Sequence, residues 1–505
     1  MAMGPIWTVD EARLADRMVQ ESGLPLAALL ATAGFQLARA VRQRWPSGPW
    51  VILTGPGANG GDGWVAARHL ARYGLTTVVP IAEPAFPDSA GWVSQARAAG
   101  AEIIRGEEAH ERMRRAAVVV DAMYGTGFHG HVAESPAGPW LNFLADGQIP
   151  VAAADIASGV NGDTGAYEGP PVTVALTVAM GAAKWGHVGY PGADFCPHLV
   201  IADVGLARRP LARPSGEFIE PAWAASKFPR MSLLAHKYTR GHVVIAGGSR
   251  AMPGAPLLAG LAALTAGAGL VEVVMPQSAL TSGVSFSPAL IVHPADETAD
   301  GSLAWGAALE SRARRADAVV LGPGLGEHPD RNLLAGLLRL AKPTVVDADG
   351  LRLVREAAKL PENWVLTPHA RELGALLNKQ AGDIDGDRRA AVLEATARFG
   401  CPILLKGRFS LVAEADHVWV NPTGNPSLAT AGSGDVLSGM AARLMAAGLA
   451  AADALALACY WHGWTADCTG MDGVGFTAVE LAGSLKSGAK AIVELRPPVG
   501  VSELV

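Results

Sequence analysis

The stretch NPSLATAGSGDVLSGM, residues 425–440, decides the fold of the second half of this 505-residue chain. Small residues from Ala429 to Gly434 lead directly into apolar residues at helical spacing, beginning with Val436, Leu437 and Met440. A loop that enters a helix in this way presents unpaired backbone N–H groups and the positive end of the helix dipole. The stretch therefore predicts an anion site, above all for phosphate, where the helix begins.

Asp435 follows directly after this predicted phosphate site. A carboxylate repels a bound phosphate, so its position requires a reason. One interpretation is that Asp435 removes a proton from a hydroxyl group that attacks the phosphate. The alternative is that Asp435 only caps the helix, which is a common role for aspartate.

The composition excludes several classes of protein. Half of the residues are hydrophobic and 17% are charged, so large cores form and extensive disorder is excluded. The net charge of -6 argues against a nucleic-acid partner or a membrane-surface protein. Four cysteines without a CxxC pair are typical of reduced thiols in the cytoplasm, and residues 1–10 show no secretion signal. Residues 251–271 are uncharged, but prolines and glycines interrupt them, which favours a buried helix over a membrane span.

The first half alternates strands with helices. Residues 7–45 read as two helices separated at Gly23-Leu24-Pro25, and the strand 50–53 is followed by a glycine-rich loop, 54–63, and a helix, 64–70. This order is the first unit of a nucleotide-binding sheet. Further strands are expected at 76–82, 101–105, 117–121, 150–155, 172–180 and 198–204, with a helix at 89–99.

Polar residues follow three of these strands, at the points where the strands end. They are Asn59, Asp121, and Asp155 with Ser158. Each could serve only as a loop cap. Because parallel strands share one carboxyl edge, where ligands bind in open sheets, we expect these side chains to converge on a ligand site.

A Pro- and Arg-rich segment from Leu206 to about Arg240 marks a boundary between two α/β domains, which we place at residues 1–213 and 222–505. The second series begins at residues 241–249. Its expected strands are 271–275, 289–292, 318–321, 344–349, 364–369 and 402–407, with a ribbon at 411–413 and 418–420 and helices at 257–266 and 436–447.

The second series brings further polar groups to the edge that carries Asp435. They are Lys406 and His369, each at a strand end, and the loop 322–326. Together with the phosphate site they suit phosphoryl transfer from a nucleotide to a hydroxyl. Lys406 could also be an ordinary surface lysine, and His369 could only hydrogen-bond a loop. His462 and Trp461 read as helix packing.

At these residues the chain resembles a known family. Residues 424–439, with 236–243, 322–326, 347–349 and 366–369, are similar to the signature of NAD(P)H-hydrate dehydratases of the ribokinase-like superfamily. Residues 59–63, Asp121 with 125–127, and 155–159 resemble NAD(P)H-hydrate epimerases. The resemblance implies a Rossmann-like three-layer α/β/α domain followed by a ribokinase-like domain. It also implies repair of NADH and NADPH hydrated at C6, by epimerisation and by nucleotide-dependent dehydration.

For the first domain, the resemblance implies that Asp155 is the acid/base that acts on the C6 hydroxyl. It also implies a potassium ion held by Asn59, Asp121 and Ser158. The implied substrate-binding residues are Gly60, Gly61, Asp62, Gly125, Thr126, Gly127, Phe128, His129, Gly130 and His131.

For the second domain, the resemblance implies that Asp435 is the base and that ADP, rather than ATP, donates the phosphate, with Mg²⁺. The residues implied to face the hydrated cofactor are Ala255, Gly324 and His369, besides Asp435. Those implied to bind the nucleotide are Lys406, Gly407, Arg408, Phe409, Ser410, Gly432, Ser433 and Gly434. We also expect a cytoplasmic homo-oligomer.

Two alternatives belong to other classes of function. The second domain could be a ribokinase-like kinase of a small alcohol, which would accumulate a phosphorylated product. The first domain could then be a nucleotide sensor or an interaction module without catalysis.

Overall fold

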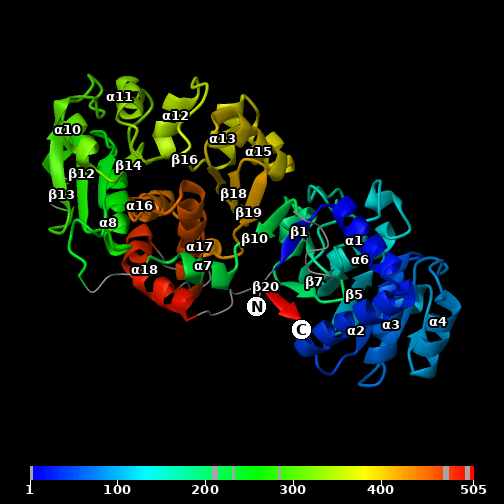
Figure 1. The fold of residues 1–505 in the computed structure, drawn as a ribbon. Helices are drawn as coiled ribbons and strands as arrows, with labels where there is room; N and C mark the ends of the chain where they lie inside the picture. Colours follow the sequence, from blue (N-terminus) through cyan, green and yellow to red (C-terminus); the bar gives the residue numbers. More distant parts are fainter. Residues whose placement is uncertain are drawn as a thin grey trace. The chain divides into compact units, whose positions relative to one another are not determined.

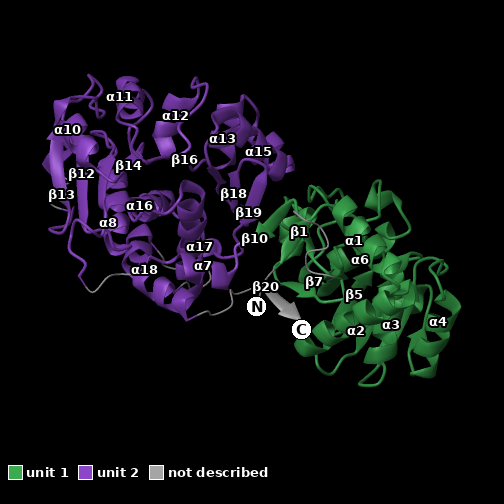
Figure 2. Cartoon of the chain, in the orientation of Figure 1, with its two compact units in different colours: residues 1–218, 500–505 green, residues 219–499 purple. Residues whose placement is uncertain are grey.

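The computed structural model describes residues 4–206, 214–229, 234–281, 286–469 and 477–494, and the backbone of residues 501–504. The chain divides into two compact units, Met1–Phe218 with Gly500–Val505 and Ile219–Val499 (Figure 2). The predicted ranges 1–213 and 222–505 differ from these units chiefly in the last strand, which lies in unit 1. Residues 207–213 and 230–233 of the predicted boundary segment lie outside the described residues.

Unit 1 contains a parallel sheet with the strand order β20-β9-β7-β6-β5-β2-β3-β4 (Figure 1). Its strands are β2 (Trp50–Thr54), β3 (Thr76–Pro80), β4 (Glu102–Ile103), β5 (Val118–Ala122), β6 (Val151–Ala154), β7 (Val174–Met180), β9 (Leu199–Ala202) and β20 (Val501–Leu504). A short antiparallel pair, β1 (Pro5–Trp7) and β10 (Gly216–Phe218), and the strand β8 (Ala183–Lys184) parallel to β1 complete the strands of unit 1.

Helices cover both faces of this sheet. One core cluster joins strand residues such as Ile52 and Val120 to α2 (Leu26–Arg44) and α3 (Ala58–Leu70). The other joins Val51 and Val119 to α5 (Glu107–Arg114) and α6 (Gly138–Gly147). Successive strand residues point to opposite faces, so continuous apolar strands fill both layers. The three-layer α/β/α prediction is confirmed. The remaining helices are α1 (Val9–Glu21) and α4 (Ser89–Ala98).

The predicted loop at residues 54–63 is wrong in its second half, because α3 already begins at Ala58. The glycines of this segment serve helix packing as well as the turn. A Cβ on Gly60 would lie 1.9 Å from the carbonyl oxygen of Gly55, and one on Gly63 would lie 2.8 Å from Cβ of Ala122. Glycine therefore lets the first two turns of α3 pack directly against the ends of β2 and β5.

Unit 2 contains the strand order β13-β12-β11-β14-β15-β16-β17-β18-β19, parallel from β13 to β17 and antiparallel from β17 to β19. The strands are β11 (His242–Ala246), β12 (Leu270–Pro276), β13 (Ile291–Ala295), β14 (Ala318–Leu321), β15 (Thr344–Val346), β16 (Trp364–Leu366), β17 (Ile403–Leu405), β18 (Leu411–Glu414) and β19 (His417–Val420). The predicted antiparallel ribbon is thus confirmed.

One face of this sheet packs in a core cluster with α8 (Gly254–Thr265), α16 (Ser433–Ala446), α17 (Ala451–Thr469) and α18 (Ala478–Val493). The helices between the other strands are α10 (Ala307–Arg315), α11 (Asn332–Leu340), α12 (Leu351–Val354), α13 (Ala370–Leu377), α14 (Ala381–Gly386) and α15 (Arg388–Phe399), and α7 (Pro221–Lys227) precedes β11. The uncharged segment around α8 is a core helix, as expected. Within the described residues, no helix is both long and apolar enough to cross a membrane.

The contact between α8 and α16 generates a stability prediction. A Cβ on Gly439 would lie 2.1 Å from the carbonyl oxygen of Ala259, so Gly439→Ala forces the two helices apart. We expect it to lower the free energy of unfolding of unit 2 by about 2–4 kcal/mol. The matched control is Gly483→Ala in α18, where a Cβ meets nothing within 4 Å. This control should be neutral or stabilising by up to about 1 kcal/mol. Urea unfolding measures both, and equal effects would contradict the packing argument.

Candidate functional site

The first site lies at the beginning of α16. Its N-cap, Gly432, has a φ of 89° and provides no capping side chain. A side chain at this position would collide with Leu258, whose Cδ1 would lie 2.7 Å from a Cβ. The N–H of Ser433 donates to the carbonyl oxygen of Thr430 at 3.4 Å, and the absence of a capping side chain leaves the N–H groups of Gly434 and Asp435 as the donors that an anion could reach.

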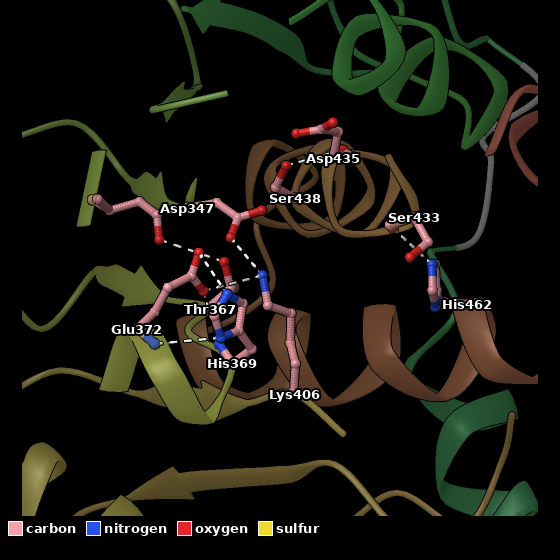
Figure 3. A network of polar contacts seen from close by, with 10 residues as sticks. Asp347, Thr367, His369, Glu372, Lys406, Ser433, Asp435, Ser438 and His462 are labelled. Atoms are coloured by element: carbon pink, nitrogen blue, oxygen red, sulfur yellow. Dashed lines mark hydrogen bonds and ion pairs between the residues drawn. The ribbon is translucent and has the colours of Figure 1, made fainter. Parts of the chain in front are cut away.

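Lys406 lies beside this helix end in a group of charged side chains (Figure 3). Its Nζ lies 2.9 Å from Oδ1 of Asp347 and 3.7 Å from Oε2 of Glu372. The same Nζ would lie 3.4 Å from a Cβ on Gly434, so the ammonium group faces the start of α16. Burial tends to lower the pKa of Lys406, but the carboxylates of Asp347 and Glu372 outweigh it and raise the pKa. Lys406 is thus a fixed cation at the predicted phosphate site rather than an ordinary surface lysine.

The carboxyl group of Asp435 titrates close to neutral pH. Burial, and after it the negative charge of Asp347, raises its pKa to about 7, against the opposing effect of Lys406. A helix N-terminus favours a carboxylate, but burial among other acids dominates here. A group with this pKa is suited to accept a proton near pH 7.

His462 is a further contributor to this site, although the sequence suggested only packing. It is 8% exposed, and burial lowers its pKa to about 4, so the imidazole is neutral. Its Nε2 lies 3.0 Å from the carbonyl oxygen of Ser433, so that nitrogen carries the proton and donates it. This bond from α17 fixes the first turn of α16 (Figure 3). No sequence signal distinguished His462 from the core residues around it.

The other predicted residues of unit 2 lie on neighbouring loops. Gly324 has a φ of 70°, and a Cβ there would lie 3.3 Å from Cβ of Ala255, so these two positions are in contact. The backbone N–H of His369 donates to Glu372, which also approaches Lys406. In the loop after β17, the hydroxyl of Ser410 donates to the carbonyl oxygen of Gly407 at 2.8 Å. This loop holds Arg408, whose guanidinium lies over the ring of Phe409.

The second site is a cavity of about 520 Å³ in unit 1. Most of the predicted residues line it, namely Asn59, Asp62, Gly125, Thr126, Gly127, Phe128, His129 and Asp155. Gly60, Gly61, Gly130 and His131 are not among its lining residues. Gly61 instead faces Leu30 and Phe86, and His131 pairs with Glu168.

Asp155 is held firmly at one wall of this cavity. Its φ of 59° is unusual for a residue with a side chain, and such strain often occurs at functional sites. Its Oδ1 lies 2.5 Å from Nζ of Lys184, which is 3% exposed. The ring of His187 accepts from the N–H of Lys184 and donates from Nε2 to the carbonyl oxygen of Asp155. Lys184, in the two-residue strand β8, belongs to no sequence motif that would have marked it as a site residue.

The pKa values of two carboxyl groups that line this cavity, those of Asp155 and Asp62, are shifted in opposite directions. Burial alone would raise the pKa of Asp155, but the Lys184 ammonium outweighs it and lowers this pKa below its ordinary value. Burial, and then the charge of Asp155, raises the pKa of Asp62 well above its ordinary value. Carboxyl groups separated in this way can serve as base and as proton donor.

Three residues predicted to hold a cation each carry a side-chain oxygen atom that could bind it. They are Asn59, which lines this cavity, Asp121 and Ser158. Ser158 donates to Asp121 from its hydroxyl at 2.6 Å and from its backbone N–H at 2.8 Å. Asn59 is 9% exposed, and both polar atoms of its amide lack a hydrogen-bond partner among the described residues. A Cβ on Gly125 would lie 3.4 Å from Asn59 and 3.7 Å from Asp155. A buried amide without partners is rare and indicates a ligand.

In the part of the chain that the structure describes, no group of three or more His, Cys, Asp or Glu side chains could hold a metal ion. The four cysteines, all of them within the described residues, form no disulfide with one another.

Comparisons with known proteins cover both units. A family model described as NAD(P)H-hydrate dehydratase matches residues 243–483, and one described as YjeF-related protein N-terminus matches residues 26–186. The chain is 34% identical over 487 residues to the bifunctional NAD(P)H-hydrate repair enzyme Nnr of Moorella thermoacetica, covering 91% of each chain. It is 31% identical over 477 residues to that of Coxiella burnetii, covering 92% of this chain and 94% of the relative.

Solved structures with similar folds cover unit 2. One is the ADP/ATP-dependent NAD(P)H-hydrate dehydratase of Bacillus subtilis, co-crystallised with ATP and Mg²⁺. It is 25% identical, with a TM-score of 0.47, and the match covers 55% of this chain and 98% of that one.

The raised pKa of Asp435 generates a prediction on stability. The ordinary value is 3.8 and the folded value about 7, so the folded protein binds more protons between these pH values, and stability falls as the pH rises through this window. Asp435→Asn removes this cost, so it should stabilise unit 2 at pH 8 by up to about 4 kcal/mol and by much less near pH 4.

Urea unfolding at several pH values measures this difference. Asp300→Asn, at an exposed position, is the control and should show no such pH dependence. A difference between Asp435→Asn and the parent protein that stays constant from pH 4 to pH 8 would contradict the assignment.

Proposed function

This chain belongs to the family of bifunctional NAD(P)H-hydrate repair enzymes, and we propose that unit 1 epimerises the hydrated cofactor while unit 2 dehydrates its S form. The observation that carries the proposal is the carboxyl group of Asp435, with a pKa of about 7, at a helix N-terminus that no side chain caps. A site for phosphate beside a base suits phosphoryl transfer to a hydroxyl.

In unit 1, Asp155 acts on the C6 hydroxyl of the hydrate. The Lys184 ammonium keeps Asp155 ionised, so its carboxylate can accept the hydroxyl proton. As that proton leaves, the C6–N bond can break to give a carbonyl group at C6, while the ring nitrogen takes up a proton. When the nitrogen adds back to either face of this carbonyl and the oxygen regains a proton, the ring closes with either configuration. The pKa of Asp62 is raised by burial and by the charge of Asp155, which favours its protonated form and suits it to donate a proton to the substrate.

Potassium is the cation that we propose for unit 1. Asn59, Asp121 and Ser158 would hold it through an amide, a carboxylate and a hydroxyl oxygen, which suit a hard cation. The buried, unpartnered amide of Asn59 supports this assignment. Such an ion would supply a positive charge for an oxygen atom of the substrate.

In unit 2, the open N–H groups of α16 and the ammonium of Lys406 bind the phosphates of the nucleotide. Asp435 takes the proton from the C6 hydroxyl, whose oxygen forms a bond to the terminal phosphorus as the bond to AMP breaks. The phosphate then leaves C6 as the ring nitrogen donates electrons, and the neighbouring ring carbon loses a proton. The products are reduced cofactor, AMP and inorganic phosphate.

ADP is the donor that we propose, with ATP less favoured. Mg²⁺ binds carboxylate and phosphate oxygens, and Asp347 offers a carboxylate at this edge. The small-molecule partners are then the NADH and NADPH hydrates and ADP. We further propose that the protein is a cytoplasmic homo-oligomer without a nucleic-acid partner. Light scattering at several concentrations measures its oligomeric state directly.

Separate substitutions should separate the two activities. Asp155→Ala should slow the interconversion of the R and S hydrates by about 10²- to 10⁴-fold and leave dehydration of the S form intact. Asp435→Asn should slow dehydration of the S form, leave the interconversion of the hydrates intact and still bind ADP. Chromatography of both epimers, with absorbance of the reduced cofactor, measures both rates. Parental epimerisation in Asp155→Ala would refute the role of Asp155, and parental dehydration in Asp435→Asn that of Asp435.

Lys184→Met should change the pH dependence of epimerisation. Without the ammonium group, burial dominates and raises the pKa of Asp155, so the acid limb of kcat/KM should move upward by about one to three pH units. Lys184→Arg retains the cation and serves as the control. An unchanged acid limb in Lys184→Met would show that Lys184 does not set the ionisation of Asp155.

A further inference from the structure

Two arginines of unit 2 lie close together and form no ion pair with an acidic side chain of the described residues. Arg443 is in the last turn of α16 and only 4% exposed, and Arg240 precedes β11. Among the described residues, Nε and Nη1 of Arg443 and Nε of Arg240 are buried and have no hydrogen-bond partner. Burial, and after it the charge of Arg240, lowers the pKa of Arg443 to about 10, so Arg443 remains charged at neutral pH. Buried cations that are not paired are costly, and proteins rarely retain them without a counter-charge.

The guanidinium groups of Arg240 and Arg443 both approach the turn at Gly267. Gly267, in the turn between α8 and β12, has a φ of 103°. Outside Gly267 and its chain neighbours, the heavy atoms nearest to the point where its Cβ would stand are Nη2 of Arg240 at 3.5 Å, Nε of Arg443 at 3.7 Å and Nη2 of Arg443 at 3.8 Å. Both guanidinium groups therefore lie beside this turn and close to each other, and two guanidinium groups so placed can donate to the oxygen atoms of one anion.

The backbone compensates only part of this charge. The C-terminal ends of α8 and α16 lie next to the pair, since a Cβ on Gly241 would lie 3.0 Å from the carbonyl oxygen of Ala446 and Gly267 follows α8. Each helix end contributes about half a negative charge, so the two together offset about one of the two cations. About one positive charge is left, which matches a single bound anion.

We propose that Arg240 and Arg443 form a second anion site in unit 2, which binds one tetrahedral oxyanion such as inorganic phosphate or the phosphate group of an ester. The site is separate from the catalytic one. Arg443 follows Asp435 by eight residues, about 12 Å along the axis of α16, and therefore lies toward its other end. A phosphate bound there would join α8, α16 and the start of β11, and would stabilise unit 2 in proportion to its affinity.

Thermal unfolding of the full chain with phosphate or with sodium chloride at equal ionic strength tests the site. Phosphate should raise the Tm of unit 2 in the parent protein by about 5 °C at a concentration near 100 times the Kd, and sulfate should have a similar effect. Any phosphate bound at the catalytic site contributes equally in all variants. Arg443→Met removes the buried cation, so it should fold normally and lose most of the phosphate increment.

Two further variants complete the experiment. Arg240→Met, at a less buried position, should lose the increment as well, whereas Arg315→Met, at an exposed position in α10, should retain it. A parallel series with AMP distinguishes the sources. If the increment that depends on Arg443 appears with AMP too, the site accepts phosphate esters, and if not, it takes the free ion. An equal phosphate increment in the parent, Arg443→Met and Arg240→Met proteins would overturn the proposal, as would the absence of a phosphate effect in the parent.

Discussion

The structure of unit 2 depends on one electrostatic constraint, which is that the partly buried carboxyl group of Asp435 lies at a helix N-terminus, close to other acids and to the ammonium group of Lys406. Asp435 lies among other acids, and burial with the charge of Asp347 raises its pKa to about 7. The opposing charge of Lys406 is held by Asp347 and Glu372. Gly432 and Gly434 bring no side chain over the start of α16, and the bond from His462 fixes its first turn. Each of these features adjusts where a proton and a phosphate can be placed.

In unit 1 a buried carboxyl group has the opposite pKa shift. Asp155 is also buried, but the ammonium of Lys184 contacts it directly, and its pKa falls instead of rising. Burial, and then the charge of Asp155, raises the pKa of the neighbouring Asp62. The pKa values of two carboxyl groups in one cavity are thereby shifted in opposite directions, which suits the base and the proton donor of the proposed epimerisation. In unit 2 a single carboxyl group of intermediate pKa suffices, because in the proposed reaction the proton leaves the hydroxyl only once.

The sequence predicted the elements better than the contacts between them. Strands such as Trp50–Thr54 and Val118–Ala122 are continuous apolar runs between turn residues, which is typical of a parallel sheet buried on both faces. The start of α3 was misplaced because glycine signals turns, whereas Gly60 and Gly63 here permit close packing. Lys184, Glu372 and His462 were missed because each reaches its site through tertiary contacts and belongs to no local pattern. The catalytic and binding roles of the predicted residues stay predictions until they are measured.

The central claim is that the C6 hydroxyl attacks the phosphate while Asp435 takes its proton, and the fate of that oxygen atom tests it most directly. Hydrate prepared in ¹⁸O-labelled water carries the label at C6. After complete conversion of the S form with ADP, ³¹P resonance or mass spectrometry locates the label. We expect one labelled oxygen in the inorganic phosphate for each molecule of reduced cofactor formed. Label released into water, with unlabelled phosphate, would show that the hydroxyl never bonds to phosphorus and would contradict this account.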